Sequence, residues 1–199
     1  SYPSITEAAL AAKDGDVVTL LKDTVETSEI ARSVTLDGKG FTVTGKLILL
    51  GEISVTLRDV QVTNPNGAAL ALSEGSAVSL CLEGENSFIS TNATPDQNAG
   101  IQTTGAKLTL DGQGVTTVTG GMSSAGIGGG LMNMGGDLVV NAGMLIVTGG
   151  YDAAGIGSGW TDGAVEEKGS VTINGGTVSA VAGQYSAGIG GGHKCAGVS

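Results

Sequence analysis

Apolar and polar residues alternate in short runs along most of the chain. In the segment SVTINGGTVSAVAG, which begins at Ser170, the residues Val171, Ile173 and Val178 would point to one side, and the threonines and serine between them to the other. This period of two is typical of a half-buried β-strand. Because each such unit consists of a strand, a turn bearing glycine and a second strand, the chain is predicted to be all-β after its first residues.

The sequence also contains a longer repeat, in addition to this alternation. The segment AGIGGG at 125–130 returns as AGIGSG at 154–159 and as AGIGGG at 187–192, with a degenerate forerunner, AGIQ, at 99–102. Asp-Gly turns also favour an antiparallel hairpin, but a meander of hairpins does not explain near-identical segments at nearly constant spacing. The repeat therefore predicts a right-handed, single-stranded parallel β-helix of about six to seven coils, with an antiparallel sandwich as the alternative.

In a β-helix, equivalent residues of successive units stack on one another, and glycine serves the sharp corners. We expect Ile127, Ile156 and Ile189 to form an aliphatic column in the interior. The first inward residues of the units are expected to stack in the order Val34, Val55, Val78, Leu108, Leu138 and Val171. The turns after these strands are expected to form a second column of Asp37, Arg58, Cys81, Asp111, Asn141 and Asn174.

The first sixteen residues have a different pattern. The segment SITE at 4–7 has the form of a capping box, and the alanine-rich stretch 7–13 is predicted to be helical. The sequence DGD at 14–16 ends this helix, and 17–20 begins the first strand. We expect residues 1–16 to form a cap that protects the open strand edge of a β-helix spanning 17–199. No matching cap follows Ser199, so we expect further coils or another domain beyond it, in a longer protein.

Composition and charge exclude several classes of protein and argue against several kinds of partner. The 36 glycines follow no three-residue period, which excludes collagen, and the many aliphatic residues between them exclude a flexible linker. The net charge of −10, without a basic stripe, argues against nucleic-acid binding. No apolar run approaches the length of a membrane helix, so membrane insertion is not expected. Cys81 and Cys195 fall in distant coils, about 19 Å apart at the strand spacing, and are predicted to be free.

The SVTLDGKGFTVTG segment from Ser33, together with the AGIGGG, INGGTV and VTGG repeats, resembles right-handed β-helix repeat regions in surface proteins of Gram-positive bacteria. Those regions look related in fold to pectate lyases and to β-helical carbohydrate-binding domains of secreted clostridial proteins. The resemblance covers the chain from about Val17 onward and is specific for architecture rather than activity. It implies an extracellular setting at a bacterial cell surface.

Large residues recur beside the AGIGxG segments. Trp160 and His193 directly follow such a segment, as Leu131 does, and Tyr151 and Tyr185 precede one. Exposed rings near polar groups suit sugar stacking or protein contact, although large residues also simply cover corner backbone. We take the edge bearing Tyr151, Trp160, Tyr185 and His193 as the candidate site for a glycan or a host surface protein.

Calcium and catalysis are the remaining chemical hypotheses. No cofactor is expected, but calcium is possible at Asp152, Asp162, Glu166 and Glu167, although a solvated acidic loop explains these residues better. The lyase-like relatives hold calcium with clustered Asp residues and use an Arg or Lys as base, whereas this chain has only Arg32 and Arg58 as arginines. No repeat position supplies a convincing carboxylate pair for a glycosidase. We therefore expect a non-catalytic adhesion or carbohydrate-binding module, with a passive stalk and a lyase or hydrolase of acidic glycans as alternatives.

Overall fold

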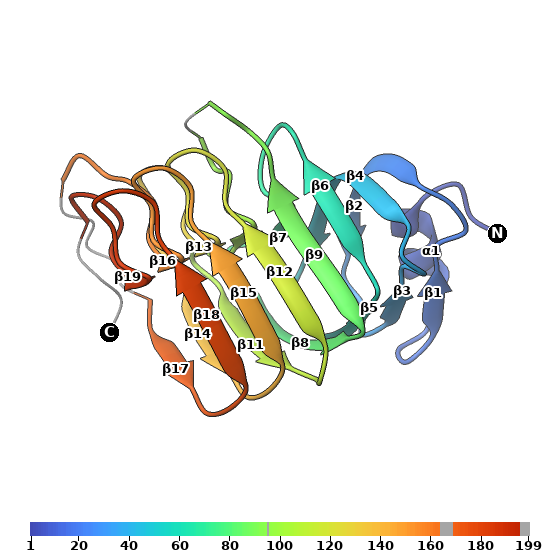
Figure 1. Ribbon diagram of the computed structural model, residues 1–199. Coiled ribbons are helices and arrows are strands. Elements are labelled where there is room, and N and C mark those ends of the chain that lie inside the picture. The colour runs from blue at the N-terminus through green and yellow to red at the C-terminus, as the bar shows by residue number, and fades with distance from the viewer. Residues whose placement is uncertain (95, 164–168, 196–199) are drawn as a thin grey trace.

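The computed structural model describes residues 1–94, 96–163 and 169–195, and every strand pairing among them is parallel. Figure 1 shows the strands side by side along one axis, from the N-terminal helix to the last coil. The parallel pairing confirms the predicted parallel β-helix and rules out the antiparallel sandwich. No helix in the described ranges is both long and apolar enough to cross a membrane.

Each complete coil contributes a strand to each of three faces. The first face is a seven-stranded sheet of β1 (Val17–Thr19), β3 (Thr35–Asp37), β5 (Glu52–Arg58), β8 (Ala77–Glu83), β11 (Lys107–Asp111), β14 (Asp137–Val140) and β17 (Val171–Ile173). The second contains β6 (Gln61–Asn64), β9 (Glu85–Ser90), β12 (Val115–Thr119), β15 (Met144–Thr148) and β18 (Thr177–Val181). The third contains β7 (Leu70–Leu72), β10 (Ile101–Gln102), β13 (Ile127–Gly128), β16 (Ile156–Gly157) and β19 (Ile189–Gly190).

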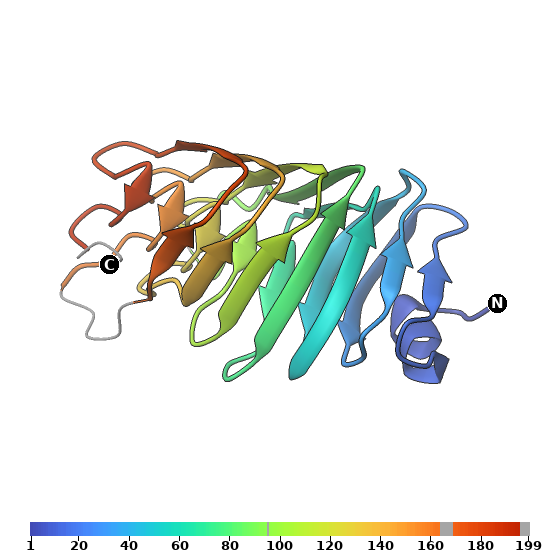
Figure 2. The same cartoon turned by 90° about the horizontal axis from the view of Figure 1, so that it is seen from below.

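Two early strands join the second and third faces into one sheet. They are β2 (Thr24–Ile30) and β4 (Thr42–Leu49), and β2 pairs with β4 along its whole length. The first residues of β4 pair with β6, whereas its last residues pair with β7. In the later coils a loop replaces this continuous strand, so the second and third faces separate. Figure 2 shows the coils following one another from α1 toward β19.

The aliphatic column expected from the AGIGxG repeat is present in the core. Ile127 pairs with Ile156, and Ile156 pairs with Ile189 in the next coil. Ile127 and Ile156 are each 1% exposed, whereas no described coil covers Ile189, which is 43% exposed. The column is therefore a shared interior in which each isoleucine depends on its neighbouring coils.

The N-terminal helix, α1 (Ile5–Ala11), begins as its sequence predicts. The Ser4 Oγ accepts a hydrogen bond of 3.1 Å from the Glu7 N–H, which satisfies one free donor of the first turn. Ile5 and Ala9 are buried and belong to the same apolar core as the coils. The helix thus packs its apolar side against the first coil (Figure 2).

One part of the predicted register is wrong. Val55 pairs with Leu80, and Ile53 pairs with Val78, so the third unit is shifted by two residues from the expected alignment. The column of turn residues consequently breaks, because Arg58 faces Glu83 instead of Cys81. Beyond this point the expected order returns, and the Asn174 amide donates a 3.0 Å hydrogen bond to the Asn141 side chain. The two cysteines of the chain, Cys81 and Cys195, are free, as predicted.

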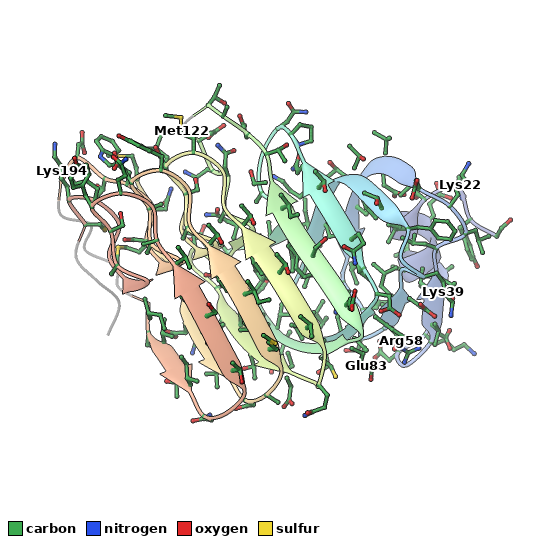
Figure 3. The ribbon with its side chains drawn as sticks, viewed as in Figure 1. Lys22, Lys39, Arg58, Glu83, Met122 and Lys194 are labelled. Carbon is green, nitrogen blue, oxygen red and sulfur yellow. The ribbon has the colours of Figure 1, made fainter. Side chains whose placement is uncertain are left out.

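The shifted register creates a charged cluster at the turn between the first two faces. The Arg58 guanidinium lies 2.7 Å from the Glu83 carboxylate, and Lys39 lies 2.8 Å from the Asp37 carboxylate. Figure 3 shows Arg58 and Glu83 next to each other, with Lys39 nearby. The hydrogen bond from Lys39 lowers the pKa of Asp37, and the hydrogen bond to Glu83 raises the pKa of Arg58. Burial is the main cause that raises the pKa of the nearby Cys81 thiol.

Candidate ligand-binding corner

The AGIGxG segments fold as tight turns around the two-residue strands of the third face. In each turn the alanine N–H donates to a carbonyl four residues later, from Ala125 to Gly129 and from Ala154 to Ser158, at 2.9 and 3.1 Å. Residues 125–130 and 153–159 are entirely buried. The surface at this edge is therefore made by the loops on both sides of the short strands.

These loops are joined from one coil to the next by backbone hydrogen bonds. The Trp160 N–H donates to the Ser123 carbonyl at 3.0 Å, and one coil later the His193 N–H donates to the Asp152 carbonyl at 2.9 Å. The loops before the short strands cover residues 120–124, 149–152 and 182–188, and the loops after them cover 131–136, 160–163 and 191–195. We call the surface that these loops form the loop edge. Figure 3 shows Met122 and Lys194 on this edge.

Repetition places the large residues at equivalent positions of the loop edge. Leu131, Trp160 and His193 each lie four residues after a paired isoleucine of the third face. Tyr185 lies four residues before its isoleucine, and the equivalent residue one coil earlier is Asp152. Both Tyr185 and Asp152 adopt a positive φ, of 54° and 58°, so the same turn geometry presents the two side chains.

The structure brings Tyr185, His193 and Asp152 together. The rings of Tyr185 and His193 have their centroids 5.2 Å apart and are tilted by 40°. The His193 Nδ1 lies 3.6 Å from the Asp152 Oδ2. Tyr185 is 77% exposed, whereas the Asp152 side chain is only 16% exposed. We refer to these three residues as the ligand corner.

Tyr151 and Trp160 occupy different places on the same edge. Tyr151 is exposed but stands one residue before Asp152, so it is equivalent to Met122 and not to Tyr185. Trp160 is half-buried. In the described ranges, the pair of Tyr185 and His193 is the one contact between aromatic rings. Of the four residues taken from the sequence as a site, two therefore meet directly.

Asp152 is the residue whose role sequence reasoning missed. The sequence marks it only as a weak calcium candidate, whereas the structure places it against His193. The sequence does contain the information needed to find this contact. Asp152 and Tyr185 each lie four residues before an aligned isoleucine, so the repeat places them at equivalent positions in neighbouring coils. In the described part of the chain, no three His, Cys, Asp or Glu side chains lie close enough together to hold a metal ion. Asp162 is exposed, and Glu166 and Glu167 lie outside the described residues.

The geometry of the ligand corner suits stacking more than proton transfer. An exposed phenol ring beside an imidazole offers a rigid aromatic surface with two polar edges. The Asp152 Oδ1 and the His193 Nδ1 are buried and have no hydrogen-bond partner among the described residues. The carboxylate therefore lies close to the imidazole, at 3.6 Å, without a hydrogen bond between the two side chains.

A protein-family model described as a β-helix repeat matches residues 171–193. This segment runs through β17, β18 and β19 and ends at His193. This match and the parallel strand pairing together show a parallel β-helix. No curated protein and no solved structure matches it. The match to the repeat agrees with the stacked coils, and it includes the two rings of the ligand corner.

Proposed function

We propose that this chain is a non-catalytic adhesion or carbohydrate-binding module of an extracellular bacterial surface protein, and that the ligand corner contacts a glycan or a host surface protein. The observation that carries the proposal is the exposed ring of Tyr185 held against His193. Aromatic side chains give a large contact area at low conformational-entropy cost. The loop edge repeats over the last three coils, so neighbouring loops can extend the contact along the axis.

Charge supports the choice of partner. The chain has nineteen acidic against nine basic residues, so its charge disfavours nucleic acid and anionic membranes, whereas a neutral ligand meets no such repulsion. Two observations favour binding over a lyase-like reaction at the charged turn. The Arg58 guanidinium contacts the Glu83 carboxylate through its Nε and Nη2 atoms, and this contact raises the pKa of Arg58. The side chain is therefore held in its protonated form, which cannot accept a proton as a general base.

A broad array of glycans and host surface proteins, probed with the full chain, tests the proposal. The variant Tyr185→Ala is expected to lose about 5-fold or more in affinity for any ligand found, and a 5-fold loss corresponds to about 1 kcal/mol. Tyr2→Ala is the matched control, because Tyr2 is also exposed, at 57%, but lies at the other end of the solenoid.

The possible outcomes separate the hypotheses. Binding that Tyr185→Ala and Trp160→Ala both leave unchanged would place the ligand elsewhere. The absence of any ligand on the array would favour a passive stalk. Release of unsaturated or reducing sugar ends from acidic polysaccharides, assayed with and without calcium, would make the chain a lyase or hydrolase.

A further inference from the structure

A second candidate site lies on the outer side of the first face, away from the loop edge. It is a hollow of about 320 Å³ that crosses three neighbouring strands, β5, β8 and β11. We call it the serine hollow and define it by six lining residues: Glu52, Ser54, Ala77, Ser79, Lys107 and Thr109. None of these residues takes part in the ligand corner.

The register of the strands explains why the sheet is hollowed here. Glu52, Ala77 and Lys107 form one row across the three strands, so the short alanine lies between two long side chains. Ser54, Ser79 and Thr109 form the adjacent row of small side chains. The alanine and the two serines make the floor, and the charged side chains make its two ends.

The second row carries three hydroxyl groups at the regular strand spacing of about 4.8 Å. Each hydroxyl can donate one hydrogen bond and accept two. In the described ranges, the side-chain hydroxyls of Ser54, Ser79 and Thr109 make no hydrogen bond to the protein, and Ser54 and Ser79 are exposed. The row is thus a line of free donors and acceptors parallel to the solenoid axis.

The two side chains at the ends of the hollow, Glu52 and Lys107, carry opposite charges. Glu52 and Lys107 are two strand spacings apart, or roughly 10 Å at their backbones, and neither forms an ion pair within the described part of the chain. A single ammonium group in a chain of net charge −10 does not favour a polyanion. A hydroxyl-lined floor equally disfavours an apolar ligand, which would leave these polar groups without water or partners.

We propose that the serine hollow binds a short stretch of a neutral glycan chain, aligned with the axis of the solenoid. Sugar hydroxyls match the line of Ser54, Ser79 and Thr109, because both partners donate and accept hydrogen bonds. Glu52 accepts from hydroxyls at one end, and Lys107 donates to sugar oxygens at the other. The inference shares the glycan ligand class with the proposed function but places the contact on a different face.

The test is a titration of the full chain with cellohexaose and xylohexaose, followed through backbone amide NMR signals, with tri-galacturonate as the acidic probe. We expect a neutral oligosaccharide to shift the amide signals of Ser54, Ser79 and Thr109. Ala77→Leu fills the floor of the hollow and is expected to raise the dissociation constant at least tenfold. Ser179→Leu is the matched control, because Ser179 is an exposed outward residue of β18 on another face, and it should leave binding unchanged.

The same spectra distinguish this inference from the proposed function. Shifts confined to Tyr185 and His193 would overturn the serine hollow and support the ligand corner. Shifts confined to the hollow would support it and overturn the corner as a glycan site. Tighter binding of tri-galacturonate at the hollow, or no binding of either neutral oligosaccharide, would overturn the inference.

Discussion

Two equivalent glycines allow the contact between coils to be measured separately from backbone strain. Gly157 and Gly190 both follow the paired isoleucine of the third face and have nearly the same φ, 137° and 139°. A Cβ on Gly157 would overlap the carbonyl oxygen of Gly190 in the next coil. A Cβ on Gly190 would meet only the Ala187 Cβ, at 3.2 Å, among the described residues.

The two alanine variants therefore share one energetic cost and differ in another. Holding alanine at this φ costs about 1–3 kcal/mol in both variants. Forcing the coils apart to admit a methyl group adds a further cost of about 1–3 kcal/mol, and only Gly157→Ala incurs it. We expect Gly157→Ala to lower the free energy of unfolding by about 2–6 kcal/mol, and Gly190→Ala by about 1–3 kcal/mol.

Urea unfolding followed by far-UV circular dichroism measures the difference directly. The midpoint should fall clearly further for Gly157→Ala than for Gly190→Ala, with similar slopes. Equal losses for the two variants would refute the argument, because they would mean that the clash with the next coil contributes nothing.

Two further predictions follow from the core and from the charged turn. Ile127→Ala removes a fully buried side chain and should lower the free energy of unfolding by about 2–5 kcal/mol. Ile189→Ala, at the exposed end of the column, should lower it by less than half as much in the same urea assay. Equal losses for the two variants would contradict the stacked interior. The pKa of the Asp37 carboxyl is lowered because Lys39 donates a hydrogen bond to it. The ionised carboxylate therefore stabilises the folded chain at pH values above the ordinary carboxyl pKa of about 4, and this stabilisation is lost as the pH falls below that value. Asp37→Asn should therefore be less stable than the wild type at pH 7, by up to about 1 kcal/mol for a partly exposed pair. Unfolding midpoints measured between pH 7 and pH 2 should show this gap closing in acid, and a constant gap would contradict the assignment.

The repeated residues explain how much of the fold could be predicted from the sequence. Ile127, Ile156 and Ile189 lie in near-identical segments, so their register followed directly from the alignment of the copies. The error between Val55 and Val78 has a physical cause, because β5 and β8 both alternate over seven residues. A shift by two residues keeps every apolar side chain inside, so the pattern of burial cannot decide between the two registers.

The candidate site was less predictable than the fold. The sequence places Tyr185 and His193 beside the repeat, but their ring contact depends on two loops of the last coil approaching each other. Asp152 belongs to the preceding coil, and its contact with His193 depends on the stacking of the loops. The serine hollow could not be found from the strand pattern alone, because it depends on the corrected pairing of β5 with β8.

The ring contact at the ligand corner is tested most directly by an aromatic NOE experiment on the full chain, with and without a ligand identified on the array. The chain has one histidine and three tyrosines, so the signals of His193 and Tyr185 can be assigned by single substitutions. With the ring centroids 5.2 Å apart, we predict an NOE between the two rings and a shift of both sets of ring signals when the ligand is added. The absence of the NOE, or ring signals that do not move at saturating ligand, would contradict the account.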